Sequence, residues 1–186
     1  NITAELRQVL EMPNLAKFTS QASILDTKGE FLFSFRPVQP AVNLADRAQF
    51  RAHVERDTGM FYISPVVQGR VSGVQSFHIS RRINNPDGSF GGVVSLALQT
   101  RYFTEIFAKI TQEPRNFFLS GRDGLIRATD DELAGLIGQS LKERPIFEKI
   151  RANPLQGEYV GIGALTQKQK IVSYRAVGAY PLYVVV

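Results

Sequence analysis

One basic segment, residues 46–57, carries the side chains whose types and spacing best suit binding chemistry. On a helix, residues three, four and seven positions apart share one face, which here groups Arg47, Phe50, Arg51 and Val54. The apolar members of this stripe are expected to face a core, so the two arginines should reach the interior or its rim. The polar residues between them are then expected to face water: Asp46, Gln49, His53 and Arg56.

A buried arginine needs an anionic partner, because its charge is costly to remove from water. Two partners fit: a carboxylate of the protein itself, or a carboxylate-bearing ligand that the guanidinium holds through two parallel hydrogen bonds. For Arg47 we favour the internal salt bridge. For Arg51, with Arg70 closing the rim, both alternatives stay open and we favour the ligand.

Few residues are available for other chemistry. Zero cysteines and two histidines leave almost no ligands for a transition metal. The acidic run at residues 130–132 is expected to cap a short helix, and the glycines at residues 88–92 lead into a strand, which suits a turn and not a phosphate site. No nucleophile or metalloprotease motif occurs. We therefore expect no catalytic residue, no metal and no cofactor.

Charge and composition narrow the partners. The chain has 186 residues, 44% of them hydrophobic, and a formal net charge of +5. Its basic residues are scattered as singles and pairs, so we expect no nucleic acid partner. No apolar run is long enough to cross a membrane. Because the chain starts at Asn1 and ends in an apolar run, we interpret it as a piece of a longer protein.

Hydrophobic patterning and turn residues predict mostly antiparallel strands. After an N-terminal helix, a hairpin is expected at residues 22–35, and Asn43 is expected to cap a helix that runs to residue 57. Strands at 61–67, 74–83 and 90–99 should follow, and Thr100 should cap the next helix. In the second half, Ser140 is expected to start a helix over residues 141–152, among further strands at 116–120, 125–128, 157–162, 169–177 and 182–186.

The two halves of the chain repeat one pattern. The turn at Gly29 matches the turn at Gly124, an offset of 124 − 29 = 95, and Ser80 matches Ser173, an offset of 173 − 80 = 93. The same order of elements at a near-constant offset predicts a tandem repeat. The expected fold is α+β, with two tandem units that each hold a five-stranded antiparallel sheet flanked by helices. The second helix offers no inward arginine pair, so we expect the second unit to be mainly structural.

Several short motifs, in their types and in their order along the chain, resemble those of the double Cache domain, a PAS-like sensor of bacterial diguanylate cyclases and sensor histidine kinases. The first half contributes Asp46, Arg47, Phe50 and Arg51, then residues 61–65, 80–83, 86–94 and 102–103. The second half contributes residues 122–124, Gly138, 173–175 and 180–186. The resemblance covers roughly residues 15–186. It divides the chain into the end of a long N-terminal helix at residues 1–20, a membrane-distal unit at 21–112 and a membrane-proximal unit at 113–186.

The resemblance implies a periplasmic ligand sensor of an inner-membrane protein, with no enzymatic activity in this piece. Membrane helices would flank the chain, the N-terminal helix would form a homodimer, and the cytoplasmic output would be a cyclase or a kinase. Alternatives from other classes are a dimerisation or protein-interaction domain without a ligand, a chemoreceptor sensor domain, and a hydrolase with a site assembled from distant residues.

The resemblance also implies that the distal unit holds the small-molecule pocket, between its sheet and the helix of residues 46–57. Mapped onto this chain, the pocket residues are Arg47, Phe50, Arg51, Tyr62, Ser64, Arg70, Ser72, Ser76 and His78. The aromatic and acidic set that holds a ligand ammonium in amino-acid sensors has no match here, which favours an organic acid. Ser76 and His78 share one strand face by alternation, although His78 also suits a hydrogen-bonded core position.

Overall fold

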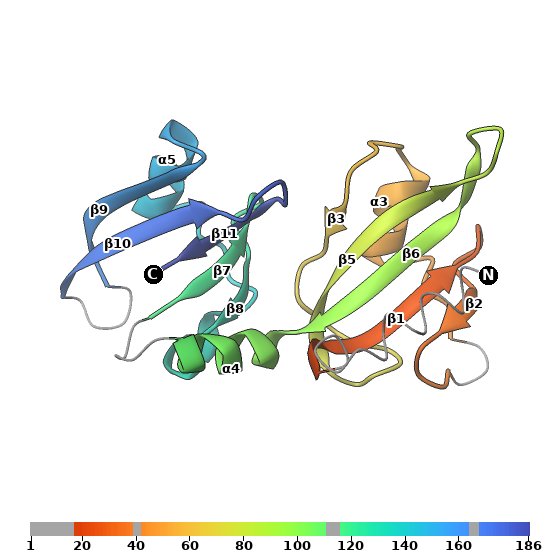
Figure 1. Cartoon of the computed structure of the whole chain (residues 1–186), viewed down its shortest axis with the longest axis horizontal. Coiled ribbons are helices and arrows are strands. Elements are labelled where there is room, and N and C mark those ends of the chain that lie inside the picture. Colours follow the sequence, from red (N-terminus) through yellow and green to blue (C-terminus); the bar gives the residue numbers. More distant parts are fainter. Residues whose placement is uncertain (1–16, 39–41, 111–115, 164–167) are drawn as a thin grey trace. The chain divides into compact units, whose positions relative to one another are not determined.

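The computed structural model describes residues 17–38, 42–110, 116–163 and 168–186. The chain divides into two compact units, Asn1–Tyr102 and Phe103–Val186, which we call the first and the second unit. Each unit contains one antiparallel sheet and flanking helices (Figure 1), which is the tandem α+β fold that the sequence predicts. The expected N-terminal helix lies almost entirely outside the described residues. Within them, no helix is long and apolar enough to span a membrane.

The sheet of the first unit has the strand order β2-β1-β6-β5-β3, and β4 also pairs with β5. The strand predicted at residues 61–67 is divided into β3 and β4, because Pro65 has no N–H with which to continue the ladder. This unit therefore holds one short strand more than expected. Its elements are β1 Thr19–Leu25, β2 Phe31–Ser34, α3 Ala48–Val54, β3 Tyr62–Ile63, β4 Val67–Gln68, β5 Gln75–Asn84 and β6 Phe90–Gln99.

The sheet of the second unit has the order β8-β7-β11-β10-β9. Its helix α5 buries Ile146, Phe147 and Ile150, the face that the sequence predicts. As expected, an acidic side chain caps the short 3-10 helix η1, since Asp130 Oδ1 accepts from Leu133 N at 3.1 Å. The elements after β6 are α4 Thr100–Ile110, β7 Phe118–Gly121, β8 Ile126–Thr129, η1 Asp131–Leu136, α5 Pro145–Ala152, β9 Gln156–Ile162, β10 Gln169–Ala176 and β11 Leu182–Val185.

Two helices begin later than their predicted caps. Asn43 Oδ1 accepts from Ala45 N at 2.8 Å, which makes a local turn, and α3 begins only at Ala48. Ser140 Oγ accepts from Lys142 N at 3.2 Å in the same way, and α5 begins at Pro145. In both places the side-chain oxygen bonds the amide two residues on, so the prediction of a helix cap there is wrong.

Alternating residues give the first sheet two different faces. On the face toward α3, Leu25 and Val93 pack with Leu44 and Phe50 in an apolar cluster at one end. Further along the same face, around the small side chain of Ala97, the buried side chains are polar: Gln21, Ser23, Ser76, His78, Ser80 and Ser95. The opposite face is apolar and includes Ala22, Ile24 and Phe33. The helix α3 therefore lies over a face that is partly hydrophobic core and partly a buried polar surface.

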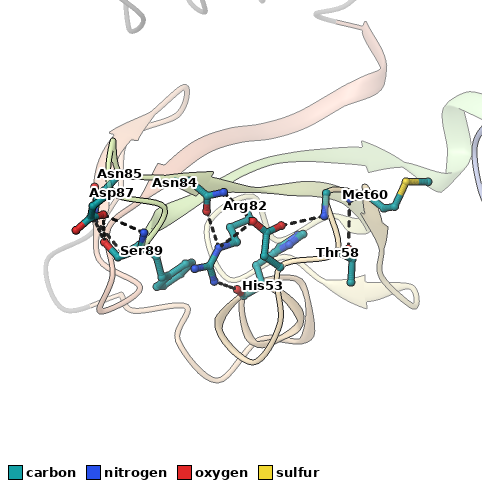
Figure 2. A network of polar contacts seen from close by, with 11 residues as sticks. His53, Thr58, Met60, Arg82, Asn84, Asn85, Asp87 and Ser89 are labelled. Carbon is teal, nitrogen blue, oxygen red and sulfur yellow. Dashed lines mark hydrogen bonds and ion pairs between the residues drawn. The ribbon is translucent and has the colours of Figure 1, made fainter.

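The end of α3 is fixed to β5 by Arg82. Its Nη1 donates to the backbone carbonyl of His53 at 2.6 Å, and its Nε donates to Asn84 Oδ1 at 2.6 Å. Asn84 in turn donates to Asp57 Oδ2 at 2.7 Å, and the Arg82 guanidinium lies 4.8 Å from the centre of the Phe90 ring. Figure 2 shows the guanidinium between His53 and Asn84. A cation at the carboxyl end of a helix also interacts favourably with the helix dipole.

This arrangement predicts that Arg82→Ala destabilises the first unit by about 1–3 kcal/mol, because a half-buried carbonyl and a carboxylate network lose their donor. The measurement is the free energy of unfolding in urea. Arg81→Ala is the matched control, since Arg81 is exposed and lies over the exposed ring of Phe61, and it should change stability by less than about 0.5 kcal/mol. Equal losses in the two variants would contradict this role for Arg82.

Candidate ligand-binding site

The inward face of α3 differs from the predicted stripe. Its buried residues are Gln49, Phe50 and His53, whereas Val54 is 46% exposed. The side chain of Arg51 is 64% exposed and forms an ion pair with Glu55 at 3.3 Å. The expectations that Arg51 and Val54 face the interior, and that Gln49 and His53 face water, are therefore wrong.

Hydrogen bonds to the polar part of the sheet explain this orientation of the helix. The Ser80 hydroxyl lies 2.9 Å from His53 Nε2 and donates to the backbone carbonyl of Gln49 at 3.0 Å. Buried polar groups on a sheet are costly unless they find partners. The helix satisfies Ser80 only when Gln49 and His53 face inward, which turns Arg51 out toward solvent.

Between α3, the sheet and the loop of residues 69–74 lies a small cavity, which we call the sheet-face cavity. Its volume is about 20 Å³. A buried water molecule needs about 10–15 Å³ of such space, so the cavity has room for one or two waters. The cavity is lined by Gln21, Ser23, Leu44, Arg47, Gln49, Gln68, Gly69, Arg70, Val71, Ser72, His78 and Ala97.

Arg47 reaches this cavity without a carboxylate partner. Its Nη2 donates to the backbone carbonyl of Gln68 at 3.2 Å, and within the described part of the chain it forms no ion pair. The internal salt bridge that the sequence favours for Arg47 is therefore not present there. Burial, together with the positive charge of Arg70, lowers the pKa of Arg47 below its ordinary value. The charge of Arg47 is thus partly desolvated, and the nearby carboxylate of Asp46, which bonds Arg70, opposes the lowering of its pKa only in part.

Arg70 has a different environment, because its charge is already matched. Its two terminal nitrogens donate to the two carboxylate oxygens of Asp46 at 2.7 and 2.6 Å, and Nη1 also donates to the backbone carbonyl of Asn43 at 2.8 Å. The hydrogen bond from Arg70 lowers the pKa of Asp46. This ion pair holds the loop of residues 69–74 against the segment before α3. Asp46 itself lines a neighbouring depression and not the cavity.

The other predicted site residues separate into two groups. Ser72 and His78 line the cavity with Arg47 and Arg70. Five do not line it: Phe50, Arg51, Tyr62, Ser64 and Ser76. Phe50 belongs to the apolar cluster, and Tyr62 packs edge-on with its ring centre 6.3 Å from that of His53. Ser64 Oγ accepts from His78 N at 2.9 Å, and Ser76 Oγ lies 2.8 Å from Ser20 Oγ, so these two hydroxyls bond within the protein.

Sequence reasoning missed several polar residues of the cavity. Gln21 and Ser23 come from β1 and Gln49 from α3, and all three are at most 6% exposed. Alternation along β1 could have identified the first two, because Leu25, two residues after Ser23, packs against α3. Gln49 and His53 are four residues apart, so on a helix they share a face, and this spacing was the signal for a second, polar face toward the sheet.

His78 is a neutral base in this site. Its Nδ1 lies 3.1 Å from Ser95 Oγ. Burial, and secondarily the charge of Arg47, lowers the pKa of His78 from 6.5 to about 4. The ring of His78 therefore adds no positive charge to those of Arg47 and Arg70 at neutral pH. Within the described residues, no group of histidine and acidic side chains could hold a metal ion.

The depressed pKa of His78 predicts a pH dependence of stability. The unfolded chain takes up this proton as the pH falls below 6.5, whereas the folded protein does so only near pH 4. Stability from this group is therefore complete above pH 6.5 and falls by about 1.4 kcal/mol per pH unit below it. Between pH 7 and pH 5, the free energy of unfolding in urea should fall by about 2 kcal/mol less in His78→Gln than in the unsubstituted protein. An identical fall in the two proteins would contradict the depressed pKa of His78.

Known proteins resemble this chain in structure. No model of a protein family and no curated protein matches the sequence. The extracellular domain of rpHK1S-Z16, described as a histidine kinase, superposes with a TM-score of 0.83 at 29% identity over 99% of this chain and 75% of its own. The ligand-binding domain of the Pseudomonas aeruginosa PAO1 amino acid chemoreceptor PctC, in complex with GABA, has a TM-score of 0.64 at 17% identity, over 98% of this chain and 78% of its own.

A third likeness is the ligand-binding domain of the Pseudomonas fluorescens chemoreceptor CtaA, in complex with L-valine. It has a TM-score of 0.64 and 16% identity, and covers 98% of this chain and 78% of that one. Both chemoreceptor domains are described as ligand-binding domains, and that of rpHK1S-Z16 as an extracellular domain. The sequence motifs resemble those of the double Cache domain. The two tandem units, the polar cavity under α3 and the similar solved structures agree with that resemblance. The chain is accordingly an extracytoplasmic sensor domain with the double Cache fold.

Proposed function

We propose that the first unit binds a small organic carboxylate in the sheet-face cavity and that Arg47 is its anchor. The observation that carries the proposal is the guanidinium of Arg47, which lines the cavity with one backbone hydrogen bond and no ion pair within the described residues. A guanidinium matches the geometry of a carboxylate with two parallel hydrogen bonds. A bound anion would also relieve the cost of the half-buried charge.

The charge balance of the cavity supports an anion. Two cations line the cavity, and its described lining contains no aspartate or glutamate. Arg70 is neutralised by Asp46, whereas Arg47 is not. His78 is neutral above about pH 4, so it neither repels a cation nor attracts an anion at neutral pH. The unmatched charge is therefore positive.

The same balance disfavours an α-amino acid. The PctC and CtaA domains are in complex with GABA and with L-valine, each of which carries an ammonium as well as a carboxylate. A buried ammonium needs an anionic partner, and the described lining of this cavity offers none. A carboxylate without an ammonium, an organic acid, fits the charges better.

Binding requires the cavity to widen, because about 20 Å³ holds water and not an organic acid. The loop of residues 69–74 supplies Gly69, Arg70, Val71 and Ser72 to the wall, and its main restraint is the ion pair between Arg70 and Asp46. The side chains of that pair are 40% and 63% exposed, and ion pairs in water contribute little to stability. An outward movement of this loop would therefore widen the cavity at a small cost in free energy.

We propose that binding changes a cytoplasmic output through the helices that lead to the membrane. Ala97 of β6 lines the cavity, and β6 passes into α4 without a linker, because one ends at Gln99 and the other begins at Thr100. A shift at the cavity would thus reach α4 along one continuous segment. The likeness to rpHK1S-Z16 supports a histidine kinase as the cytoplasmic output. A diguanylate cyclase is an alternative output. The likeness to PctC and CtaA supports a second candidate function, the sensor domain of a chemoreceptor. In each case this piece itself would have no enzymatic activity.

We also propose that the full-length protein is a homodimer through its N-terminal helix. Ile2, Leu6, Val9 and Leu10 recur in the sequence at helical spacing, and on a helix this spacing would form an apolar stripe able to pack against a second copy.

The anchor role predicts that Arg47→Ala removes about 2–5 kcal/mol of binding free energy for a short monocarboxylate such as propionate, because one side of a buried charge pair is lost. Without ligand, the variant should be as stable as the unsubstituted protein or slightly more stable. Isothermal titration and thermal unfolding measure the two effects.

Arg51→Ala is the matched control, because Arg51 lies on the same helix but is exposed and paired with Glu55. It should leave the affinity unchanged. Loss of binding in Arg51→Ala with normal binding in Arg47→Ala would contradict the assignment and restore Arg51 as the anchor.

The dimer proposal predicts that Leu6→Glu in the full-length protein raises the dimer dissociation constant about ten-fold or more, since a charge would enter an apolar interface. Sedimentation equilibrium in detergent measures it. Gln8→Glu, which changes a residue off the stripe, should leave the constant unchanged, and equal effects of the two substitutions would argue against this interface.

A further inference from the structure

We infer that the ligand carries, beside its carboxylate, an uncharged hydroxyl or keto group, and that Gln49 binds this second group. The inference rests on the proposed function, because it takes Arg47 as the partner of the carboxylate. It adds two points to that proposal. Gln49 selects among short organic acids, and the preferred ligands are hydroxy and keto carboxylates.

The side-chain amide of Gln49 lines the cavity and forms no hydrogen bond with the residues that the structure describes. The residue is 2% exposed and lines the cavity, and in the described part of the chain only its backbone carbonyl is hydrogen-bonded, by Ser80. An amide that faces a cavity and bonds no group of the fold can form its hydrogen bonds with a bound ligand or with water.

Gln21 in the same cavity shows what a structural glutamine looks like here. Its Nε2 donates to Ser34 Oγ at 2.8 Å, and its Oε1 accepts from the backbone amides of Ala22 and Arg36, each at 3.0 Å. Both ends of that amide are therefore used within the fold. The contrast marks Gln49 as the glutamine whose amide is available to a ligand.

Two neutral neighbours extend the same surface. Ser23 is 5% exposed, lines the cavity, and its hydroxyl makes no hydrogen bond with the residues that the structure describes. His78 lines the cavity and uses Nδ1 toward Ser95, which leaves Nε2 for another partner. Beside the charge of Arg47, the cavity thus presents an amide, a hydroxyl and an imidazole. These groups can donate to or accept from a hydroxyl or a keto oxygen, but they cannot neutralise an ammonium.

Four acids that share one carbon skeleton test the inference: propionate, L-lactate, pyruvate and L-alanine. Isothermal titration of the whole chain should give L-lactate or pyruvate an affinity at least about ten-fold higher than propionate, because only they satisfy the buried amide. L-Alanine should bind more weakly than propionate. In Gln49→Met, which keeps the size but removes the amide, the preference over propionate should fall to less than about three-fold while propionate still binds.

Gln75→Met is the matched control, because Gln75 is exposed on β5 and does not line the cavity, and it should leave all four affinities unchanged. Thermal unfolding establishes that the variants fold. If Gln49→Met does not fold, Ser23→Ala replaces it and should lower the affinity for L-lactate or pyruvate without changing that for propionate.

The outcomes separate this inference from the proposed function. If propionate binds as tightly as L-lactate and pyruvate, and binding depends on Arg47, the anchor is supported and the role of Gln49 is overturned; the amide then faces only water. Preferred binding of L-alanine would also overturn the inference. If none of the four acids binds, the proposed function fails and the inference fails with it.

Discussion

Polar groups that leave water need partners, and this requirement organises the first unit. The sheet under α3 carries a buried hydroxyl at Ser80, and the helix satisfies it with the His53 ring and the Gln49 carbonyl. Arg82 then fixes the end of the helix through the His53 carbonyl. These bonds set the rotation of α3, and that rotation brings Arg47 and the Gln49 amide to the cavity. The Arg47 guanidinium and the Gln49 amide therefore reach the cavity because the hydrogen bonds of Ser80 fix the orientation of the helix.

The fold was largely predictable because its signals are local. The turn at Gly29 has a φ of +79°, and a side chain there would meet the Ala45 backbone at 2.5 Å, so glycine marks the first hairpin reliably. The helix starts were not predictable in the same way. Asn43 and Ser140 are typical of both a helix cap and a two-residue turn, and only the surrounding packing selects the turn.

Of the nine residues predicted for the ligand site, Arg47, Arg70, Ser72 and His78 line the cavity, and their role in binding stays a prediction. The orientation of Arg51 and Val54 was predicted wrongly, because it depends on the rotation of α3. The rotation of α3 was inferred from its apolar residues, but the helix has only 7 residues and faces a partly polar surface. Hydrogen bonds to Ser80 therefore outweigh the burial of Val54. A stripe of polar residues, Gln49 and His53, cannot be recognised as inward-facing unless the polarity of the opposing sheet is known.

The position of a bound carboxylate tests the account most directly. The measurement is a crystal structure of the chain grown with saturating pyruvate. The account predicts one ligand in the first unit, with its carboxylate oxygens about 2.7–2.9 Å from the Arg47 guanidinium, its keto oxygen toward the Gln49 amide, and the loop of residues 69–74 moved outward. A ligand bound only in the second unit, or bound in the first unit away from Arg47, would contradict it.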